Sequence, residues 1–198
     1  INANFLAKYL ETFDLLNGWL ATTTGTYGTN YRQRAIVDKV GLGAPMPWVS
    51  LYPVALFDKT KTPLTGTKRY VAHFSPETSR PPVRFFWSMT LYDNDGFLVD
   101  NEFDRYLIND RSKPNYNEDG SLDIYIQPDK PADPRQARNW LPSPPATSAT
   151  RGFRLITRLY GLSDKGIKGV VDGTGWHGPG LLPCAPAGTT SEGVDCAS

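Results

Sequence analysis

The chain has 198 residues, which at about 150 residues per domain predicts one domain with additional segments. Its 18 glycines and 17 prolines exclude a helical bundle, and its 5 Trp, 10 Tyr and 9 Phe supply the apolar surface of a folded core. The near balance of 21 basic and 20 acidic residues removes the electrostatic basis for expecting nucleic acid or an anionic membrane as a partner.

Residues 1–47 are predicted to form a helical lead-in. Apolar residues at spacings of three and four over residues 5–16 predict an amphipathic helix that ends near Gly18. A second helix is expected over residues 29–40, because Gly41 follows its apolar positions as a stop signal. We expect both helices to pack on a sheet. No apolar run approaches the roughly 20 residues of a membrane span, and a start at Ile1 indicates that an upstream segment was removed.

Residues 48–183 change to short β-rich runs separated by turn-forming residues. The expected strands cover residues 49–57, 69–74, 83–92, 97–99, 122–127 and 153–160. Because the helical segments precede the strands and do not alternate with them, a parallel α/β sheet is disfavoured. The pattern predicts a mainly β fold, an antiparallel jelly-roll-like β-sandwich with the N-terminal helices packed on it. The proline-rich residues 128–149 are expected to form a long connection over the surface.

Residues 184–198 form a tail that carries both cysteines of the chain. Cys184 and Cys196 lie twelve positions apart, where a disulfide would close a short loop with little core of its own. Such a bond predicts a secreted or periplasmic protein, and free thiols are the alternative. Two cysteines and two distant histidines make a poor zinc set, so neither a metal nor a cofactor is expected.

Two expected strands carry a mixed polar and aromatic side. Alternation places on these sides three arginines and two tyrosines: Arg84, Arg154, Arg158, Tyr92 and Tyr160. If both sides face one cavity, they form a cationic, aromatic-walled pocket for a carboxylate, because a guanidinium binds such groups with two hydrogen bonds. The alternative is that the arginines pair with acidic residues such as Asp100, Glu102 and Asp104.

Asn139 and Trp140 in the proline-rich connection form a second candidate. A loop tryptophan beside an amide is suited to stack on a sugar or to act as a lid. The alternative is that Trp140 plugs one end of the sandwich.

Catalytic sequence signatures are mostly absent. The chain has no nucleophile elbow, zinc-protease motif, phosphate loop or dinucleotide fingerprint. His73 lies in an expected strand and would serve as a general base only with a carboxylate and a cavity on its side. A hydrolase or lyase that uses Asp and Glu side chains therefore stays open, as does a structural or assembly domain that forms homo-oligomers.

Several motifs occur in an order that resembles one protein family. They are residues 81–92 (PPVRFFWSMTLY), Asn101 with Arg105 and Tyr106, residues 119–122 (DGSL), residues 139–144 (NWLPSP), and residues 158–160 (RLY). The set resembles domain-of-unknown-function family 1214 over about residues 50–183. This resemblance implies a jelly-roll β-sandwich and no established reaction or catalytic residues.

The same resemblance implies a partner half. In the two-domain proteins of this family, the domain is the C-terminal half that follows domain-of-unknown-function family 1254. The present chain lacks that N-terminal half and carries an extra tail, as a proteolytic fragment would. The sequence thus predicts a secreted jelly-roll domain that binds a small carboxylate or carbohydrate ligand, with Arg84, Arg158, Tyr160, Asn139 and Trp140 as the ligand-binding residues.

Overall fold

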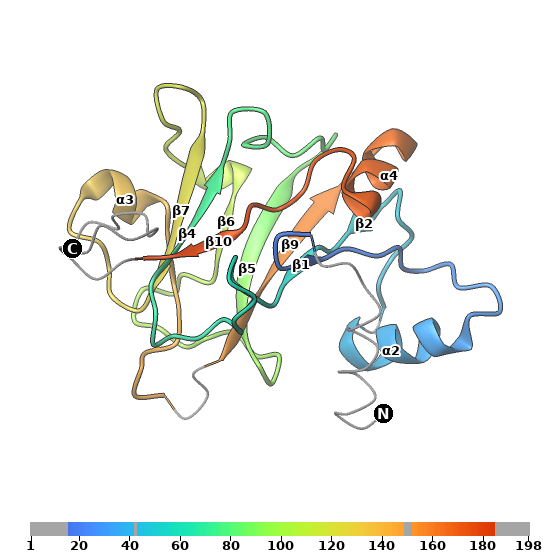
Figure 1. Ribbon diagram of the computed structural model, residues 1–198, viewed down its shortest axis with the longest axis horizontal. Coiled ribbons are helices and arrows are strands. Elements are labelled where there is room, and N and C mark those ends of the chain that lie inside the picture. The colour runs from blue at the N-terminus through green and yellow to red at the C-terminus, as the bar shows by residue number, and fades with distance from the viewer. Residues whose placement is uncertain (1–15, 42, 149–151, 185–198) are drawn as a thin grey trace.

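The structure, a computed structural model, describes residues 16–41, 43–148 and 152–184 (Figure 1). These residues are mainly β-structure with a few short helices. In chain order the elements are β1 (Trp19–Leu20), α2 (Tyr31–Gly41), β2 (Ser50–Leu51), β3 (Val54–Ala55), β4 (Tyr70–Phe74), β5 (Trp87–Asp93), β6 (Leu107–Asn109), η1 (Asp110–Ser112), β7 (Leu122–Gln127), α3 (Pro134–Arg138), β8 (Trp140–Pro142), β9 (Phe153–Tyr160), α4 (Asp164–Asp172) and β10 (Leu181–Pro183).

The strands form two sheets. A six-stranded sheet has the order β1-β3-β9-β5-β6, and β2 also pairs with β9. A four-stranded sheet has the order β10-β4-β7-β8. Pairing is antiparallel throughout except between β7 and β8, which are parallel. The expectation of a mainly β, largely antiparallel fold is therefore confirmed.

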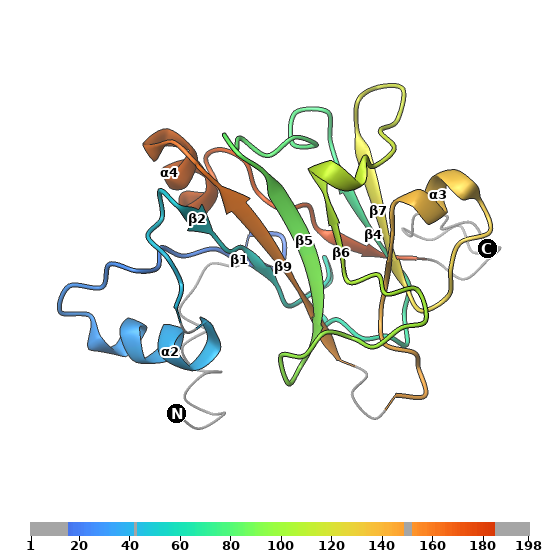
Figure 2. The ribbon, with the colours of Figure 1, turned by 180° about the vertical axis from the view of Figure 1, so that it is seen from behind.

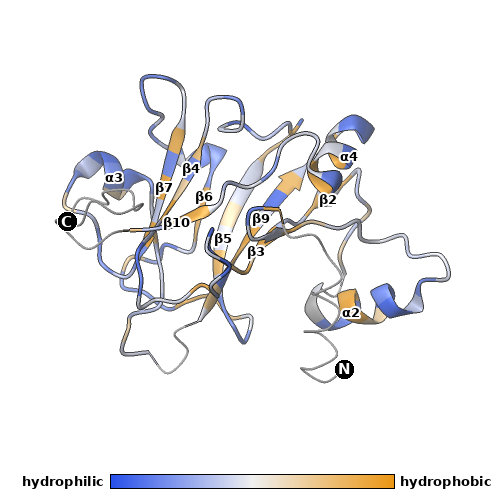
Figure 3. Cartoon of the chain, in the orientation of Figure 1, coloured by the Kyte–Doolittle hydropathy of each residue, from blue (hydrophilic) through white to orange (hydrophobic). Residues whose placement is uncertain are grey.

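One apolar core takes residues from both sheets. Met89 and Leu155 of the six-stranded sheet and Ile124 of the four-stranded sheet belong to the same buried cluster. The rings of Tyr70 and Phe153 meet edge to face at 5.9 Å and join the two sheets directly. Apolar residues concentrate on the strands in Figure 3, whereas α3 is mainly hydrophilic.

Of the two strands at the middle of the six-stranded sheet, β9 follows the alternation that the sequence predicts, whereas in β5 the residues of both faces are buried from Trp87 to Leu91. Along β9, buried and half-buried residues alternate without a break, with Leu155 and Leu159 on the core side. In β5, Trp87, Met89 and Leu91 are buried in the core as expected. The strand nevertheless begins at Trp87 and not at residue 83, so the expected alternation does not reach the residues before it.

Two other expected strands differ from the prediction. The run over residues 49–57 is divided into β2 and β3 around Pro53, which has no backbone N–H to donate to a ladder. Residues 97–99 form no strand, only a single bridge between Leu98 and Tyr92. The short strands β1, β6, β8 and β10 were not predicted.

The helices correct the expectation of N-terminal helices packed on the sheet. The helix predicted over residues 29–40 is found as α2, with Ile36 and Val37 buried, but it lies beside the sheets in Figures 1 and 2. The helix predicted over residues 5–16 lies almost wholly outside the described residues. The other two helices, α3 and α4, come late in the chain.

The proline-rich connection contains more regular secondary structure than expected. Asp133 caps α3 by accepting a hydrogen bond from the backbone N of Arg135 at 2.7 Å, and Pro134 opens that helix. The chain then enters β8, whose three residues are all buried. Residues 128–148 therefore contain a helix and an interior strand, and are not only a surface connection.

The described residues contain neither a membrane-spanning helix nor a metal-binding cluster. None of their helices has the length and apolar character needed to cross a membrane. Within the described ranges, no group of three or more His, Cys, Asp or Glu residues is arranged to hold a metal ion. Cys184 follows β10, and its backbone N donates to the carbonyl of Arg69 at 2.8 Å. Because Cys196 lies outside the described residues, the disulfide and the tail stay predictions.

Candidate functional site

The side of the six-stranded sheet that faces away from the core is polar and aromatic. In the β5–β9 ladder, Ser88 lies opposite Arg158 and Thr90 opposite Ile156. Because paired residues of antiparallel strands project to the same face, the mixed sides of the two strands form one continuous surface. No described helix crosses β5 and β9 on this side (Figure 2).

A group of five residues on this surface is organised by one guanidinium. We call it the Arg158 cluster; its members are Tyr52, Thr90, Tyr92, Arg158 and Tyr160. Arg158 donates from Nη1 to Thr90 Oγ1 at 3.0 Å and from Nη2 to Tyr92 Oη at 2.7 Å. Its guanidinium carbon lies 5.5 Å from the ring centroid of Tyr92 and 5.9 Å from that of Tyr52. Two rings and two hydroxyls thus hold the arginine in place.

The partners of Arg158 are neutral. Among the described residues, no Asp or Glu oxygen lies within 4.0 Å of its side-chain nitrogens, since the ion pairs found there involve Lys68, Arg69, His73 and Lys168. The positive charge of a half-buried guanidinium is therefore not balanced by a carboxylate. The predicted alternative, in which acidic residues pair with Arg84, Arg154 and Arg158, is not found in the described part of the chain.

Tyr160 forms one wall of the cluster. Its ring stacks on that of Phe86 with centroids 4.3 Å apart and planes 17° apart. Burial and a hydrogen bond with the Tyr52 side chain raise the pKa of the Tyr160 phenol, while the charge of Arg158 opposes the shift. The phenol stays neutral near pH 7 and leaves Arg158 as the charge of the cluster.

Arg154 lies on the same side of β9, four residues before Arg158. It faces Tyr92 across the ladder, and its buried Nε has no hydrogen-bond partner among the described atoms. It extends the cationic surface toward the turn at Gly96.

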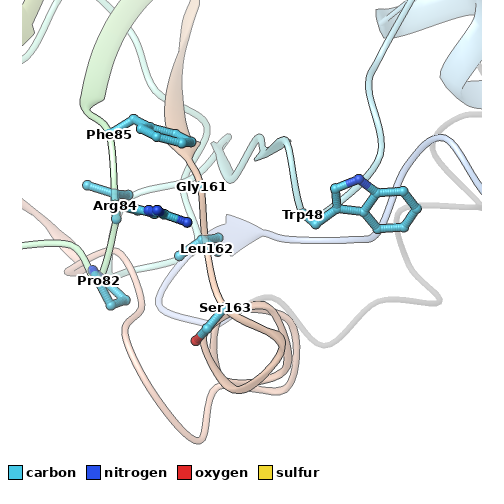
Figure 4. A pocket seen from close by; sticks show the side chains of 8 residues that line it. Trp48, Pro82, Arg84, Phe85, Gly161, Leu162 and Ser163 are labelled. Atoms are coloured by element: carbon cyan, nitrogen blue, oxygen red, sulfur yellow. The ribbon is translucent and has the colours of Figure 1, made fainter.

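Arg84 does not join the Arg158 cluster. Because β5 begins at Trp87, Arg84 belongs to the segment before the strand, where it lines a separate cleft with Trp48, Phe85 and Gly161 (Figure 4). The sequence predicted that Arg158 and Tyr160 share one side of a strand, and the structure brings them together. It also placed Arg84 on that site, but the structure places Arg84 apart from it.

Trp140 begins β8 of the other sheet, and Asn139 precedes it as the C-cap of α3. Their exposed fractions are 3% and 1%. The Asn139 amide donates to the carbonyls of Asn115 and Asp123 at 2.7 and 2.9 Å, and Trp140 Nε1 donates to the carbonyl of Gln127 at 2.8 Å. These contacts tie a loop and a core strand together. The burial of both residues keeps them from contacting a ligand in this conformation.

His73 has a carboxylate on its side of the strand, which is the first of the two conditions for a general base. On the exposed side of the four-stranded sheet its Nδ1 lies 2.6 Å from Asp123 Oδ1, and Asn117 Nδ2 donates to Asp123 Oδ2 at 2.8 Å. A carboxylate therefore orients the imidazole. No cleft that we describe includes His73.

Tyr52 and Thr90 are members of the cluster that the sequence analysis did not select as site residues. Thr90 lies two residues before Tyr92, and Tyr52 lies two residues after Ser50, so each pair would share one face of a strand. Parity alone could have placed Thr90 near Arg158. The position of Tyr52 depends on β2 and β3 pairing with β9, which only the fold reveals.

Among the comparisons with known proteins, one family model names the kind of domain. A family model described as "Protein of unknown function (DUF1214)" matches residues 49–164. No curated protein matches the chain. The solved structure of the VPA0106 protein from Vibrio parahaemolyticus is 26% identical with a TM-score of 0.60, over 75% of this chain and 34% of that one. An uncharacterised protein from Burkholderia cenocepacia is 14% identical with a TM-score of 0.44, over 93% of this chain and 41% of that one. The chain thus spans well under half the length of either protein.

Proposed function

The chain belongs to the DUF1214 family of proteins of unknown function, and we propose that it binds a small carboxylate ligand through the Arg158 cluster. The observation that carries the proposal is the uncompensated guanidinium. Arg158 is fixed by Tyr92 and Thr90, and its described neighbours provide no acidic partner.

A carboxylate is the ligand chemistry that this arrangement favours. Two hydrogen bonds to neutral hydroxyls orient the guanidinium, so little side-chain entropy remains to be lost when an anion binds. A partly buried cation interacts more strongly with an anion than a fully solvated one does, because the local dielectric constant is lower. The Tyr52 and Tyr92 rings provide apolar walls for the rest of the ligand.

Ligand-dependent thermal stability tests the proposal. A panel of small mono- and dicarboxylates and sugar acids is added to the protein, and unfolding is followed for the wild type and for Arg158→Gln. A ligand at 100 times its Kd stabilises the folded state by about 2.7 kcal/mol, or roughly 5–10 °C for a chain of this size. We expect that shift for the wild type and none for Arg158→Gln.

Arg80→Gln is the matched control, because Arg80 also lies over a tyrosine ring, with its guanidinium carbon 5.0 Å from the Tyr116 centroid. The control should keep the full shift. Equal shifts in wild type and Arg158→Gln, or no shift with any acid, would reject the proposed site.

For the fold we propose the jelly-roll sandwich that the turn spacing and the resemblance imply. The chain passes repeatedly between the sheets, for example from β3 to β4 and from β6 to β7, as jelly rolls do. The coverage of only 34% of the Vibrio protein leaves room for a DUF1254 half in longer relatives. We propose that such a half, or a second copy of this chain, is the protein partner.

Export is a further part of the proposal. It rests on the two cysteines, Cys184 and Cys196, whose spacing suits a disulfide that closes a short tail. Thiol labelling under denaturing conditions without reductant should modify neither cysteine. Labelling of both would contradict the disulfide and remove the argument for an oxidising compartment.

A second candidate function is acid–base catalysis by His73. Its support is the short contact with Asp123, an arrangement that orients an imidazole as a general base. In a screen of ester and glycoside substrates, this candidate predicts a turnover that falls at least 100-fold in His73→Ala. A turnover that survives His73→Ala and Asp123→Asn, or a screen without turnover, contradicts it.

A further inference from the structure

A cleft separate from the Arg158 cluster opens where β9 ends. Its volume is about 420 Å³, and its walls come from three distant segments of the chain (Figure 4). Its lining includes Trp48, Arg84, Phe85 and Gly161.

Two large aromatic rings stand exposed at this cleft. Trp48 is 58% exposed and Phe85 is 65% exposed. The other tryptophans of the chain, Trp19, Trp87, Trp140 and Trp176, are all buried. Exposed aromatic area that gathers in a cleft is typical of a binding surface, because burying it is favourable.

The walls of the cleft are joined by backbone hydrogen bonds at one point. Arg84 N donates to Gly161 O at 3.2 Å, and Gly161 N donates to Val49 O at 3.0 Å. Gly161 has a φ of +76°, and a Cβ there would lie 2.5 Å from Phe85 Cδ2. The segments that carry Trp48, Arg84 and Phe85 are thus fixed relative to each other before any ligand binds.

Arg84 gives the cleft its charge. Its guanidinium carbon lies 5.6 Å from the Phe85 ring centroid. In Figure 4 both side chains extend toward the Gly161 segment, and the Trp48 ring stands on the other side of that segment and points away from them. Within the described ranges, no ion pair involves Arg84. Cation and aromatic surface are therefore both available to one ligand.

We propose that this cleft binds an acidic oligosaccharide, with sugar rings packed on Trp48 and Phe85 and a carboxylate paired with Arg84. A pyranose ring has an apolar C–H face that suits an aromatic surface, while its hydroxyls stay hydrated in an open cleft. A guanidinium binds the carboxylate of a sugar acid through two hydrogen bonds. The site shares no residue with the Arg158 cluster, so the two can succeed or fail independently.

Tryptophan fluorescence tests the proposal, because Trp48 is the exposed tryptophan that acrylamide quenches most readily. The full 198-residue chain is titrated with oligogalacturonate, with its methyl ester and with an acidic peptide of the same charge. We expect oligogalacturonate to protect Trp48 from quenching and to bind at least 10-fold more tightly than the ester or the peptide.

Calorimetric measurement of the Kd of oligogalacturonate for variants tests whether the binding takes place in the cleft. Trp48→Ala, Phe85→Ala and Arg84→Gln should each weaken oligogalacturonate binding at least 10-fold, with wild-type circular dichroism as the check on folding. Phe97→Ala removes a ring that is 71% exposed outside this cleft and should leave binding unchanged. The proposal is overturned if oligogalacturonate does not bind, if the ester or the peptide binds equally well, or if Arg84→Gln has no effect.

Discussion

At the scale of single residues, Arg158 differs from an ordinary surface arginine because its planar side chain fits between two rings and two hydroxyls. A lysine has the same charge but cannot reproduce two directed hydrogen bonds or stack in this way. Arg158→Lys should therefore weaken carboxylate binding at least 10-fold while the protein stays folded. Calorimetric titration measures the loss, and an unchanged Kd would show that charge alone is needed.

Asp58 is a buried carboxylate that supports a turn. Its Oδ1 accepts hydrogen bonds from Thr60 N at 2.9 Å, Thr60 Oγ1 at 2.6 Å and Thr62 N at 3.0 Å, and Lys68 Nζ lies 3.7 Å from Oδ2. Burial alone would raise the pKa of Asp58, but the hydrogen bonds from Thr60 and Thr62 outweigh it and lower the pKa.

A lowered pKa in the folded state fixes the sign of the pH dependence. The stabilisation from Asp58 is present above the unfolded-state pKa of about 4 and is lost as the pH falls toward the folded-state value. Asp58→Asn should lower the free energy of unfolding by about 1 kcal/mol at pH 7. Between pH 7 and pH 3, the free energy of unfolding should fall less in Asp58→Asn than in the wild type. Urea unfolding at both pH values measures this, with the exposed Asp95→Asn as control. Equal losses in Asp58→Asn and wild type would contradict the assignment.

At the scale of elements, the sequence predicted β7 and β9 with the bounds that the structure has. Burial alternates throughout β9 and over the first five residues of β7, and a period of two is the pattern most readily found in a sequence. The shared side of Arg158, Tyr92 and Tyr160 followed from that alternation. The short strands β1, β6, β8 and β10 have two or three residues each, too few to show a period.

Other features of the site depend on contacts that are distant in sequence. Tyr52 reaches Arg158 only because β2 and β3 both pair with β9. Arg84 leaves the predicted face because the chain turns into β5 only at Trp87. The helix α4 carried local signals, a Ser163 cap and Gly173 in the left-handed region, but its two internal glycines weaken a helical pattern.

Gly161 links β9 to the cleft. It allows a positive φ and leaves room for the Phe85 ring, and a comparison with Gly28 separates these two effects. Gly28 also has a positive φ, +51°, but nothing lies within 4 Å of where its Cβ would be. Gly28→Ala should cost about 1 kcal/mol of unfolding free energy for the backbone alone. Gly161→Ala should cost at least about 1 kcal/mol more, because the added Cβ displaces Phe85. Guanidinium unfolding measures both, and equal costs would show that Phe85 does not need the glycine.

At the scale of the whole molecule, the two sheets share one core and should unfold together. Leu155 is fully buried at the middle of β9, whereas its neighbour Ile156 points to the outer face. Leu155→Ala should lower the free energy of unfolding by about 2–5 kcal/mol, and Ile156→Ala by less than half of that. Fluorescence and circular dichroism should give coincident transitions for both variants. Separate transitions would mean that the sheets are independent units.

If the guanidinium of Arg158 is the anion-binding group of this domain, its own signals must respond to the ligand. The most direct measurement is an NMR titration of the arginine side-chain Nε–Hε signals with the carboxylate that gives the largest thermal shift. We expect a saturable shift of the Arg158 signal, with the Arg80 signal unchanged as an internal reference. A titration in which Arg158 does not move while the ligand still binds would contradict it.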